Sequence, residues 1–265
     1  MTALADPPDA APAVDLSALE QLPREQVEEM LCAASLGVWT ERRRGMQMSA
    51  VHWEWCALAQ TRERLAVIAP REHSKSETFS VNATAHASIY QPGCYTYMFA
   101  LTGDLAEELL ARTKQVISEV RPDLVLGAQR DNATDLILAN GSRIRAAGAA
   151  KRTRGGHPDR IVGDDVLDDE NTATAAQRRK MHRWWFGSVV NMAHPGTDRR
   201  VTDANGVVHT YRMPATRIHL VGTPFHGQDL LAGMKTNPMW HYRRYAAEAW
   251  PNELVPGTLA VEVTG

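Results

Sequence analysis

Apolar positions along the chain fall into two kinds of segment that alternate, as in an α/β protein. Short apolar runs of strand type occupy residues 64–69, 95–101, 161–163 and 218–222. Longer stretches with apolar residues at helical spacing occupy residues 23–37, 75–88, 105–120 and 173–186. Gly37 and Pro122 are the expected stops of the first and third helices. This alternation predicts an α/β fold with a mostly parallel central sheet covered by helices on both faces.

Two Asn-Gly pairs interrupt this rhythm and predict β-hairpins. Asn140-Gly141 separates residues 136–138 from residues 142–144, and Asn205-Gly206 lies in the middle of residues 201–211. Because Asn and Gly tolerate positive φ, this dipeptide is a strong signal for a two-residue hairpin loop. We therefore expect small antiparallel excursions from the sheet at both places.

Composition adds limits on the class of protein. The chain is 44% hydrophobic and 23% charged, which is ordinary for a globular protein, and its formal net charge of −2 lacks the basic excess of many nucleic-acid-binding proteins. The three cysteines lie far apart, so neither a zinc site nor a disulfide framework is expected. No apolar run approaches the roughly 20 residues of a membrane span, and residues 1–14 are acidic and proline-rich rather than a secretory signal.

The carboxyl ends of three predicted strands carry residues suited to phosphate chemistry. Residues 69–76, Asp164-Asp165 and Gly222-Thr223 all follow such strands. In open α/β sheets, ligands bind beyond the carboxyl ends of the strands. These three segments are therefore expected to meet at one site.

The segment at residues 69–76 ends with the two residues, Lys-Ser, that are typical of the end of a phosphate-binding loop. Such a loop needs backbone N–H groups around the phosphates, a lysine toward the β and γ oxygens, and a hydroxyl for Mg²⁺. Lys75 and Ser76 meet the last two demands. Ala69 and Ser74 stand where the usual motif has glycine, so the segment by itself fits an exposed turn before a helix equally well.

Asp164 and Asp165 end an apolar strand. One carboxylate could hold the Mg²⁺ shell while the next orients or deprotonates the attacking water, which is the division that phosphoryl transfer needs. Adjacent acids after a strand are also common as plain turn residues. A metal-dependent nuclease that uses the acids from Asp164 to Glu170 is a further interpretation.

Arginine and threonine side chains complete the set of candidates. Arg154, which precedes two glycines, and Arg71 inside the loop are candidates for the arginine that meets a γ-phosphate. The alternative for Arg154 is a surface loop that contacts solvent or DNA phosphates. Thr223 could sense the γ-phosphate from the neighbouring strand end, although capping is the usual role of such a residue.

Taken in order, residues 68–76, 153–155, 161–165 and 221–224 resemble the large terminase family of tailed bacteriophages. That family is known for an atypical Walker A motif of the form P-R-x-x-x-K-S/T, so the missing glycines favour this resemblance. It implies a P-loop ATPase fold and ATP bound through Pro70, Arg71, Glu72, His73, Ser74, Lys75 and Ser76.

The resemblance also implies a role for each chemical group. Ser76 and Asp164 are expected to hold Mg²⁺, and Asp165 is expected to be the catalytic carboxylate. Thr223 resembles the coupling motif, and Arg154 resembles an arginine finger that reaches the ATP of a neighbouring subunit. The implied activity is ATP hydrolysis that drives double-stranded DNA into a procapsid.

The resemblance further implies an organisation and partners. We expect a disordered tail at residues 1–14, a helical segment at 15–50, the motor at 51–248 and a linker or truncated end at 249–265. The implied partners are double-stranded DNA, the portal protein and the small terminase subunit, with a homo-oligomeric ring on assembly and a monomer in isolation. The expected location is the host cytoplasm. The segment after Thr223 is too short for the nuclease domain of full-length large terminases, so no DNA cutting is expected.

Two alternatives to packaging stay open at this point. A catalytically weak or decayed P-loop module for binding or assembly would fit the replaced glycines. Another P-loop DNA motor, such as a helicase, would share the same loop and acids but separate strands.

Overall fold

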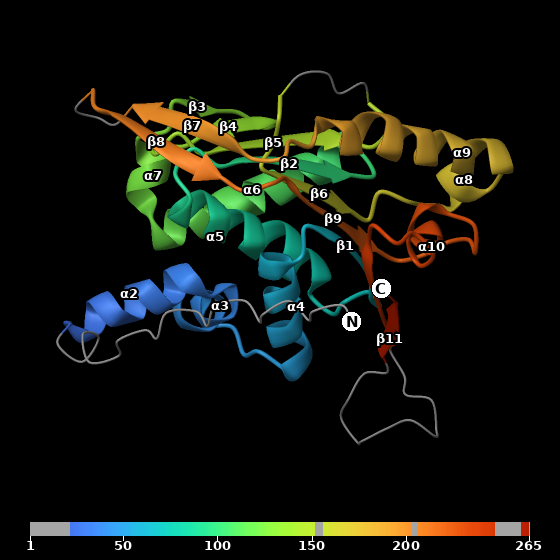
Figure 1. Ribbon diagram of the computed structural model, residues 1–265, viewed down its shortest axis with the longest axis horizontal. Coiled ribbons are helices and arrows are strands. Elements are labelled where there is room, and N and C mark those ends of the chain that lie inside the picture. Colours follow the sequence, from blue (N-terminus) through green and yellow to red (C-terminus); the bar gives the residue numbers. More distant parts are fainter. Residues whose placement is uncertain (1–21, 152–155, 203–205, 247–260, 265) are drawn as a thin grey trace, which may run out of the picture.

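A nine-stranded sheet with strand order β11-β10-β1-β9-β6-β2-β5-β4-β3 forms the centre of the computed structural model, which describes residues 22–151, 156–202, 206–246 and 261–264 (Figure 1). The strands are β1 (Arg64–Ile68), β2 (Tyr95–Ala100), β3 (Arg130–Asp131), β4 (Asp135–Ile137), β5 (Arg143–Gly148), β6 (Arg160–Asp164), β9 (Arg217–Gly222), β10 (His241–Tyr245) and β11 (Val261–Thr264). Neighbours from β10 through β5 pair in parallel, whereas β11, β4 and β3 add antiparallel pairs at the two edges. The predicted fold class is confirmed.

Helices cover both faces of this sheet (Figure 1). One face carries α2 (Arg24–Ala34), α3 (Leu36–Arg44), α4 (Ala50–Thr61), η1 (Glu77–Asn82), α5 (Ala83–Tyr90), α6 (Gly103–Val120) and α7 (Pro122–Leu126). The other carries α8 (Asp169–Thr172), α9 (Ala175–Trp184), η2 (Trp185–Val189), η3 (Val190–Met192) and α10 (Leu230–Met234). Within the described residues, no helix is both long and apolar enough to cross a bilayer.

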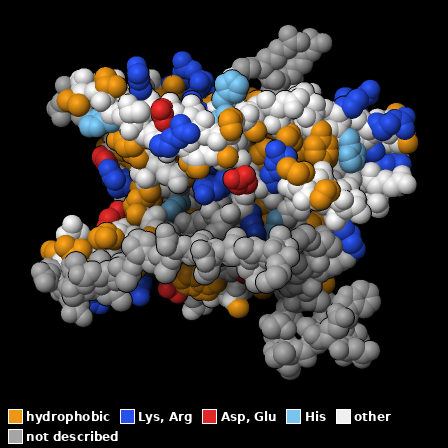
Figure 2. All heavy atoms as spheres, viewed as in Figure 1, with side chains coloured by type: hydrophobic (Ala, Val, Ile, Leu, Met, Phe, Trp, Pro, Cys, Tyr) orange, Lys and Arg blue, Asp and Glu red, His pale blue; other side chains and the backbone are white. Residues whose placement is uncertain are grey.

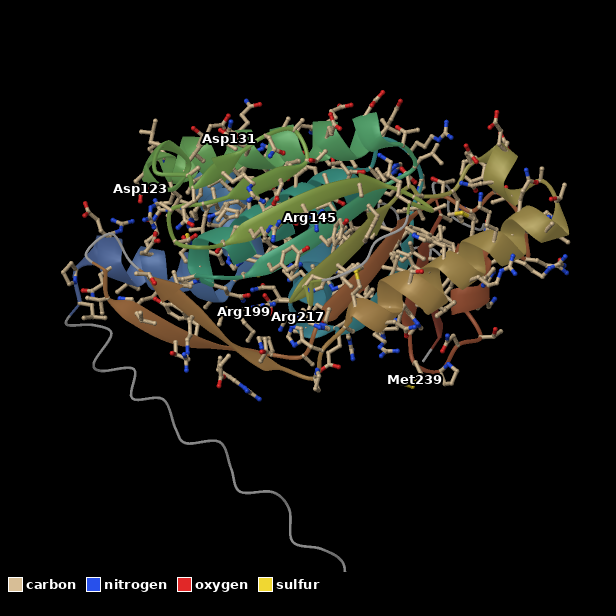
Figure 3. The ribbon with its side chains drawn as sticks, turned by 90° about the horizontal axis from the view of Figure 1, so that it is seen from above. Asp123, Asp131, Arg145, Arg199, Arg217 and Met239 are labelled. Atoms are coloured by element: carbon tan, nitrogen blue, oxygen red, sulfur yellow. The ribbon has the colours of Figure 1, made fainter. Side chains whose placement is uncertain are left out.

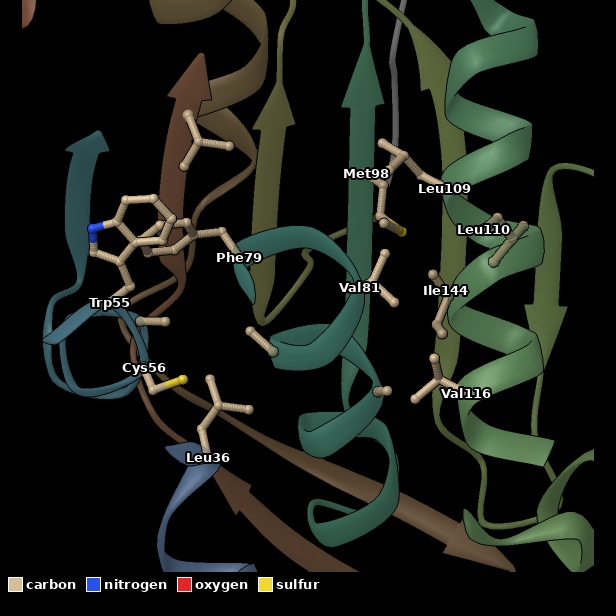
Figure 4. Close-up of a cluster of buried hydrophobic side chains, with 14 of the residues drawn as sticks. Leu36, Trp55, Cys56, Phe79, Val81, Met98, Leu109, Leu110, Val116 and Ile144 are labelled. Atoms are coloured by element: carbon tan, nitrogen blue, oxygen red, sulfur yellow. The ribbon is translucent and has the colours of Figure 1, made fainter. Parts of the chain in front are cut away.

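Each helical layer has its own apolar core. In the first layer, Trp55 of α4 is fully buried, with its ring centroid 5.5 Å from that of Phe79 in η1 and 5.4 Å from that of Tyr245 in β10 (Figure 4). In the second layer, Trp185 packs against Gly163 of β6, where an added Cβ would lie 2.7 Å from the indole. Both faces of β6 and β1 are therefore buried, as parallel strands under two helical layers require.

The N-terminal helix differs from its prediction. Residues 23–37 were expected to form one helix that stops at Gly37, but the chain breaks at Ser35, whose hydroxyl accepts a hydrogen bond from Val38 N at 3.3 Å and caps α3. Gly37 lies inside α3, where an added Cβ would lie 2.4 Å from the ring of Trp53. This glycine therefore permits close packing and does not end the helix.

Two other predicted helices exist but are divided. The helix expected from residue 75 to 88 starts as predicted, passes through the π-helical η1, and continues as α5 to Tyr90. The helix expected at 173–186 becomes α9 and η2, with Thr174 as the cap of α9. Propensity and spacing locate helices but do not specify the wider turn of a π-helix, which is frequent at functional sites.

Both hairpins are present. At the first, Ile137 of β4 pairs with Arg143 of β5, and Gly141 in the connection has a φ of 76°. Contrary to the expected excursion, β5 also pairs in parallel with β2 and belongs to the central sheet. The second hairpin, β7 (Thr197–Thr202) with β8 (Val208–Met213), is a separate two-stranded sheet, and its Asn205 lies outside the described residues.

Strands β10 and β11 were not predicted. β11 lies within residues 249–265, which were assigned to a linker or truncated end, and it pairs antiparallel with β10. The predicted tail at residues 1–14 lies outside the described residues. The domain boundaries stay predictions.

The second hairpin docks on the sheet through Val201 of β7. An added Cβ at Gly93 would lie 2.7 Å from Val201 Cγ2, and one at Gly141 would lie 2.9 Å from Val201 Cγ1. The Arg199 side chain of the same strand also pairs with the buried Asp159 at 3.3 Å. The valine methyls therefore fill the space left by the two missing side chains.

Gly141→Ala is expected to lower the free energy of unfolding by about 2 kcal/mol, because it adds both a positive-φ penalty and a clash with Val201. Urea denaturation measures this change. In the double variant Gly141→Ala/Val201→Ala the clash is removed, so the two effects should couple by more than about 0.5 kcal/mol. Additive effects would show that Val201 does not dock the hairpin.

Candidate phosphate and metal site

Three strand ends meet at one level of the sheet. Ile68 of β1 pairs with Gly222 of β9, and Asp164 of β6 pairs with Val221 of the same strand. Past these pairs, Ala69 N donates to Gly222 O at 3.4 Å and Asp165 N donates to Val221 O at 2.9 Å. The structure therefore brings together the three segments that the sequence predicted to meet.

The loop between β1 and η1 replaces glycine with strained non-glycine residues. Glu72 has a φ of 64° and Ser74 a φ of 57°, both in the left-handed region. For residues with a Cβ this conformation costs roughly 1–2 kcal/mol each. Strain of this kind persists where the surrounding structure fixes it, and it clusters at ligand sites. Ser74 thus adopts the backbone conformation that a glycine would supply in the usual motif.

Asp164 is buried and held by two serines. Its exposed fraction is 3%, and it accepts hydrogen bonds from Ser76 Oγ at 2.9 Å and from Ser80 Oγ at 2.7 Å. Burial raises the pKa of this carboxyl to about 6, the charge of neighbouring Asp165 raises it further, and the two serine hydroxyls oppose the shift. Asp164 therefore titrates close to neutral pH.

Ser80 is a site residue that the sequence analysis missed. It is fully buried, and it bonds the carboxylate oxygen of Asp164 that Ser76 does not. Its position four residues after Ser76 places both hydroxyls on one side of the helix, and this spacing was the available signal.

Asp165 has different partners from Asp164. Its Oδ2 lies 3.1 Å from Lys75 Nζ, and its Oδ1 accepts a hydrogen bond from Thr223 N at 3.1 Å. Its side chain is 45% exposed, whereas the Lys75 side chain is only 6% exposed. Asp165 also has a φ of 41°, and an added Cβ at Gly222 would lie 3.1 Å from its Oδ1. Because Gly222 has no side chain, β9 leaves space for the carboxylate of Asp165.

The remaining predicted residues differ in position. Thr223 is half-buried, and its Oγ1 is buried without a hydrogen-bond partner in the described part of the chain. Arg71 is exposed at the rim of the loop, where its carbonyl oxygen lies 2.8 Å from His73 Nδ1. Pro70 and His73 are half-buried beside it. Arg154 lies outside the described residues.

Ser76 and Asp164 fit a magnesium ion that arrives with phosphates. Among the described residues, no group of three or more His, Cys, Asp or Glu side chains could hold a metal. Mg²⁺ is typically held by one or two carboxylates together with substrate phosphates and waters. The hydroxyl of Ser76 and the carboxylate of Asp164, 2.9 Å apart, form such a donor pair.

Other charged clusters have structural roles. Asp168 caps α8 by accepting a hydrogen bond from Asn171 N at 2.7 Å, and Asp169 and Glu170 lie in the first turn of that helix. This arrangement favours helix capping over a nuclease site. On α3, Arg44 pairs with Glu77 at 2.9 Å.

Comparisons with known proteins give structural likenesses only. No family model matches the chain, and no curated protein matches it. The fold is similar to the large terminase ATPase domain of Thermus phage P74-26, with 16% identity and a TM-score of 0.47 over 74% of this chain and 72% of that one. It is also similar to the HK97 bacteriophage large terminase, with 14% identity and a TM-score of 0.45 over 76% of this chain. The chain spans 40% of the HK97 protein.

Asp164→Asn is expected to stabilise the protein at pH 8 while removing Mg²⁺-dependent activity. The folded pKa near 6 exceeds the ordinary 3.8, so the folded state binds the extra proton and stability falls as pH rises between these values. Above pH 6 the free energy of unfolding of the variant should therefore exceed that of the wild type by on the order of 1–3 kcal/mol. Denaturation at pH 4 and pH 8 tests this, since the gain should disappear at pH 4. Equal stability of variant and wild type at both pH values would contradict the buried charge.

Proposed function

We propose that this chain is the ATP-hydrolysing motor domain of a large terminase, which drives double-stranded DNA into a procapsid. One observation carries the proposal: the strained loop ending in Lys75-Ser76 faces two adjacent acids that have separate partners. Asp164 lies against Ser76 at 2.9 Å, and Asp165 lies against Lys75 at 3.1 Å. The order of the four sequence motifs supports the terminase assignment.

ATP and Mg²⁺ are the cofactors of this proposal. The ammonium group of Lys75 leaves Asp165 and binds the β- and γ-phosphate oxygens, while backbone N–H groups of the strained loop surround the phosphates. Ser76 and Asp164 would hold a Mg²⁺, whose chemistry would be to neutralise charge on the phosphates. Asp165, released from its ion pair, orients or deprotonates the attacking water.

Thr223 supports a link between hydrolysis and movement. Its backbone N–H contacts Asp165, and its buried Oγ1, which has no partner among the described residues, could bond a phosphate oxygen or a water after a small local movement. A change at the γ-phosphate would therefore act directly on the residues after β9. The proximity of Ser76 to Asp164 and of Lys75 to Asp165 supports a working site over a decayed module.

The arginine finger belongs to the same proposal. Arg154, in trans, or the exposed Arg71 would stabilise the charge of the transition state, an effect worth about 10³–10⁵ in rate. A finger supplied by a neighbour acts only in an assembled ring, so the isolated chain is expected to hydrolyse ATP slowly. Portal and small terminase subunit are the proposed assembly partners.

An open part of the sheet supports DNA as a partner. Arg143 and Arg145 of β5 project on the face opposite α6, with their guanidinium carbons 5.4 and 5.2 Å from the ring centroids of Tyr95 and Tyr97. Figure 3 looks onto this side, with Arg145 on the sheet and Arg199 on the hairpin. Within the described residues, Arg145 makes no ion pair.

Further cations flank this row. Arg145 and Lys151 line a cavity of about 220 Å³, and Arg143 and Arg200 line another of about 400 Å³ between sheet and hairpin. Neither Lys151 nor Arg200 has an ion-pair partner in the described chain. Lys and Arg side chains also gather along the top of the molecule and at its α8–α9 end (Figure 2). Arg143 is paired with Asp135 at 2.7 Å, so the cations that suit a phosphate backbone here are Arg145, Lys151 and Arg200.

Lys75→Ala is expected to abolish ATP hydrolysis while leaving the fold intact, because the phosphates lose their cation. The measurement is phosphate release with Mg²⁺ and double-stranded DNA, at protein concentrations that permit assembly. Lys114→Ala, which removes a surface lysine paired with Asp131, is the control and should retain wild-type turnover. Retained hydrolysis in Lys75→Ala would overturn the assignment, and strand separation by the wild type would favour a helicase.

Replacing Arg145 and Arg200 with Ala is expected to weaken binding of double-stranded DNA and to lower the slope of log K against log[salt] by about 1 per residue. A fluorescence-anisotropy titration at several salt concentrations gives this slope. Arg42→Ala, an exposed arginine on α3, is the matched control. An unchanged slope in the double variant would show that this face of the sheet does not bind DNA.

A further inference from the structure

We infer that Arg44, the last residue of α3, is a positioning residue for the proposed magnesium site, because it clamps the π-helical segment η1 at both of its ends. This inference rests on the proposed function, since the site that Arg44 positions is the one proposed to hold Mg²⁺. The clamp acts through Ser76 and Ser80, whose hydroxyls bond the carboxylate of Asp164.

The guanidinium group of Arg44 reaches the first and the last residue of η1. Its Nη2 lies 2.9 Å from Glu77 Oε1, and its Nε donates to Asn82 Oδ1 at 3.3 Å. The side chains of Arg44 and Glu77 are only 19% and 17% exposed, and Asn82 is fully buried. Nη1 donates to Glu119 of α6 at 2.8 Å. One rigid, planar group thus joins both ends of η1 to α6.

The spacing of the two contacts matches a π-helical turn. Residues 77 and 82 are five apart, which is the spacing that backbone hydrogen bonds join in a π-helix. Ala83 N donates to Thr78 O with the same spacing. In an α-helix, residues five apart point in directions roughly 140° apart, so one guanidinium group could not hold both. The contacts of Arg44 therefore favour the wider turn.

This turn sets the relative positions of the two serines. Ser76 directly precedes η1 and Ser80 lies inside it, and their Oγ atoms bond different oxygens of Asp164, at 2.9 and 2.7 Å. A different turn would change the distance and angle between the two hydroxyls. Groups that form a binding site must be held within about 0.5 Å of their working geometry. A side chain that fixes the turn therefore acts on the metal site without contacting it.

Glu77 makes the clamp strong. Its second oxygen, Oε2, accepts a hydrogen bond from Arg112 of α6, so each oxygen of this carboxylate is held by an arginine. Hydrogen bonds between two charged groups are roughly twice as strong as neutral ones. A carboxylate in the first turn of a helix is also favoured by the helix dipole. The residue next to Ser76 is thereby tied to two neighbouring helices.

Calorimetry with a non-hydrolysable ATP analogue, over a range of Mg²⁺ concentrations, tests the effect on the metal. Arg44→Met keeps the apolar stem of the side chain and removes all three contacts. The Mg²⁺ concentration that gives half of the metal's effect on analogue binding is expected to rise on the order of tenfold, while the affinity without Mg²⁺ changes less than about twofold. The metal-free affinity is retained because Lys75 and the phosphate loop are unchanged.

Arg44→Lys keeps a cation next to Glu77 and is therefore the variant expected to fold even if Arg44→Met does not. A lysine has no planar fork with which to reach Asn82 as well. Its Mg²⁺ dependence should shift in the same direction as in Arg44→Met, by a smaller factor. Wild-type Mg²⁺ dependence in Arg44→Lys would show that a single charge suffices and would contradict the clamp.

Hydrogen exchange tests the clamp without any nucleotide. The backbone amides of residues 77–83 should exchange faster in Arg44→Met than in the wild type, because loss of the clamp makes local opening of η1 easier. A general loss of stability would instead speed exchange throughout the sheet.

Arg43→Met is the matched control. Arg43 precedes Arg44 in α3, its side chain is 33% exposed, and it pairs with Glu28 at 3.5 Å and Glu29 at 2.8 Å, both in α2. This variant should keep the wild-type Mg²⁺ dependence and the wild-type exchange of η1. Equal shifts in both methionine variants, unchanged exchange of η1 in Arg44→Met, or an equal loss of affinity with and without Mg²⁺ would overturn the inference. No binding of the analogue by the wild type would defeat the proposed function instead, and the exchange of η1 would still decide whether Arg44 holds this segment.

Discussion

The carboxylate of Asp164 lies almost fully buried at the end of β6, where an ionised group must be compensated by hydrogen bonds or by a cation. Ser76 and Ser80 supply two hydrogen bonds, yet burial still raises the pKa of the acid to about 6. The site is thus built around a charge that the protein alone stabilises poorly. A divalent cation next to Ser76 would complete the compensation, which explains why the first turn of η1 must lie so close to β6.

The second acid is constrained by the first. Successive residues of a strand point to opposite faces, so two adjacent acids reach one site only if the backbone turns between them. Asp165 makes that turn with a φ of 41°, and Gly222 on the neighbouring strand leaves space for its carboxylate. Its ion pair with Lys75 holds together the two side chains that we propose bind phosphate and activate water. Binding of a triphosphate would separate them.

Much of this arrangement follows from local sequence pattern. The parallel strands, the helix after the loop and the three strand ends that converge were all predictable, because apolar periodicity and strand-end chemistry are local signals. Ser80 was not singled out, although its spacing from Ser76 was visible. The left-handed backbone of Glu72 and Ser74 was not predictable from propensity, since the surrounding strands and η1 impose it.

Other features depend on long-range pairing and were missed for that reason. β10, with the sequence His-Tyr-Arg-Arg-Tyr, has little period-two apolar character, and it is a strand because it pairs with the edge of β1. β11 is only four residues long and pairs with β10. β5 reads as half of a hairpin in the sequence but is held in the central sheet by β2. The docking of Val201 between two glycines likewise joins residues distant in the chain.

A crystal structure with Mg²⁺ and a non-hydrolysable ATP analogue tests the central claim most directly, because it shows which groups the two acids contact when phosphate is present. The account predicts that Lys75 Nζ moves from Asp165 to a β- or γ-phosphate oxygen, and that Mg²⁺ lies on Ser76 and the Asp164 side of the site. Lys75 still paired with Asp165, with the nucleotide bound elsewhere, would contradict the account.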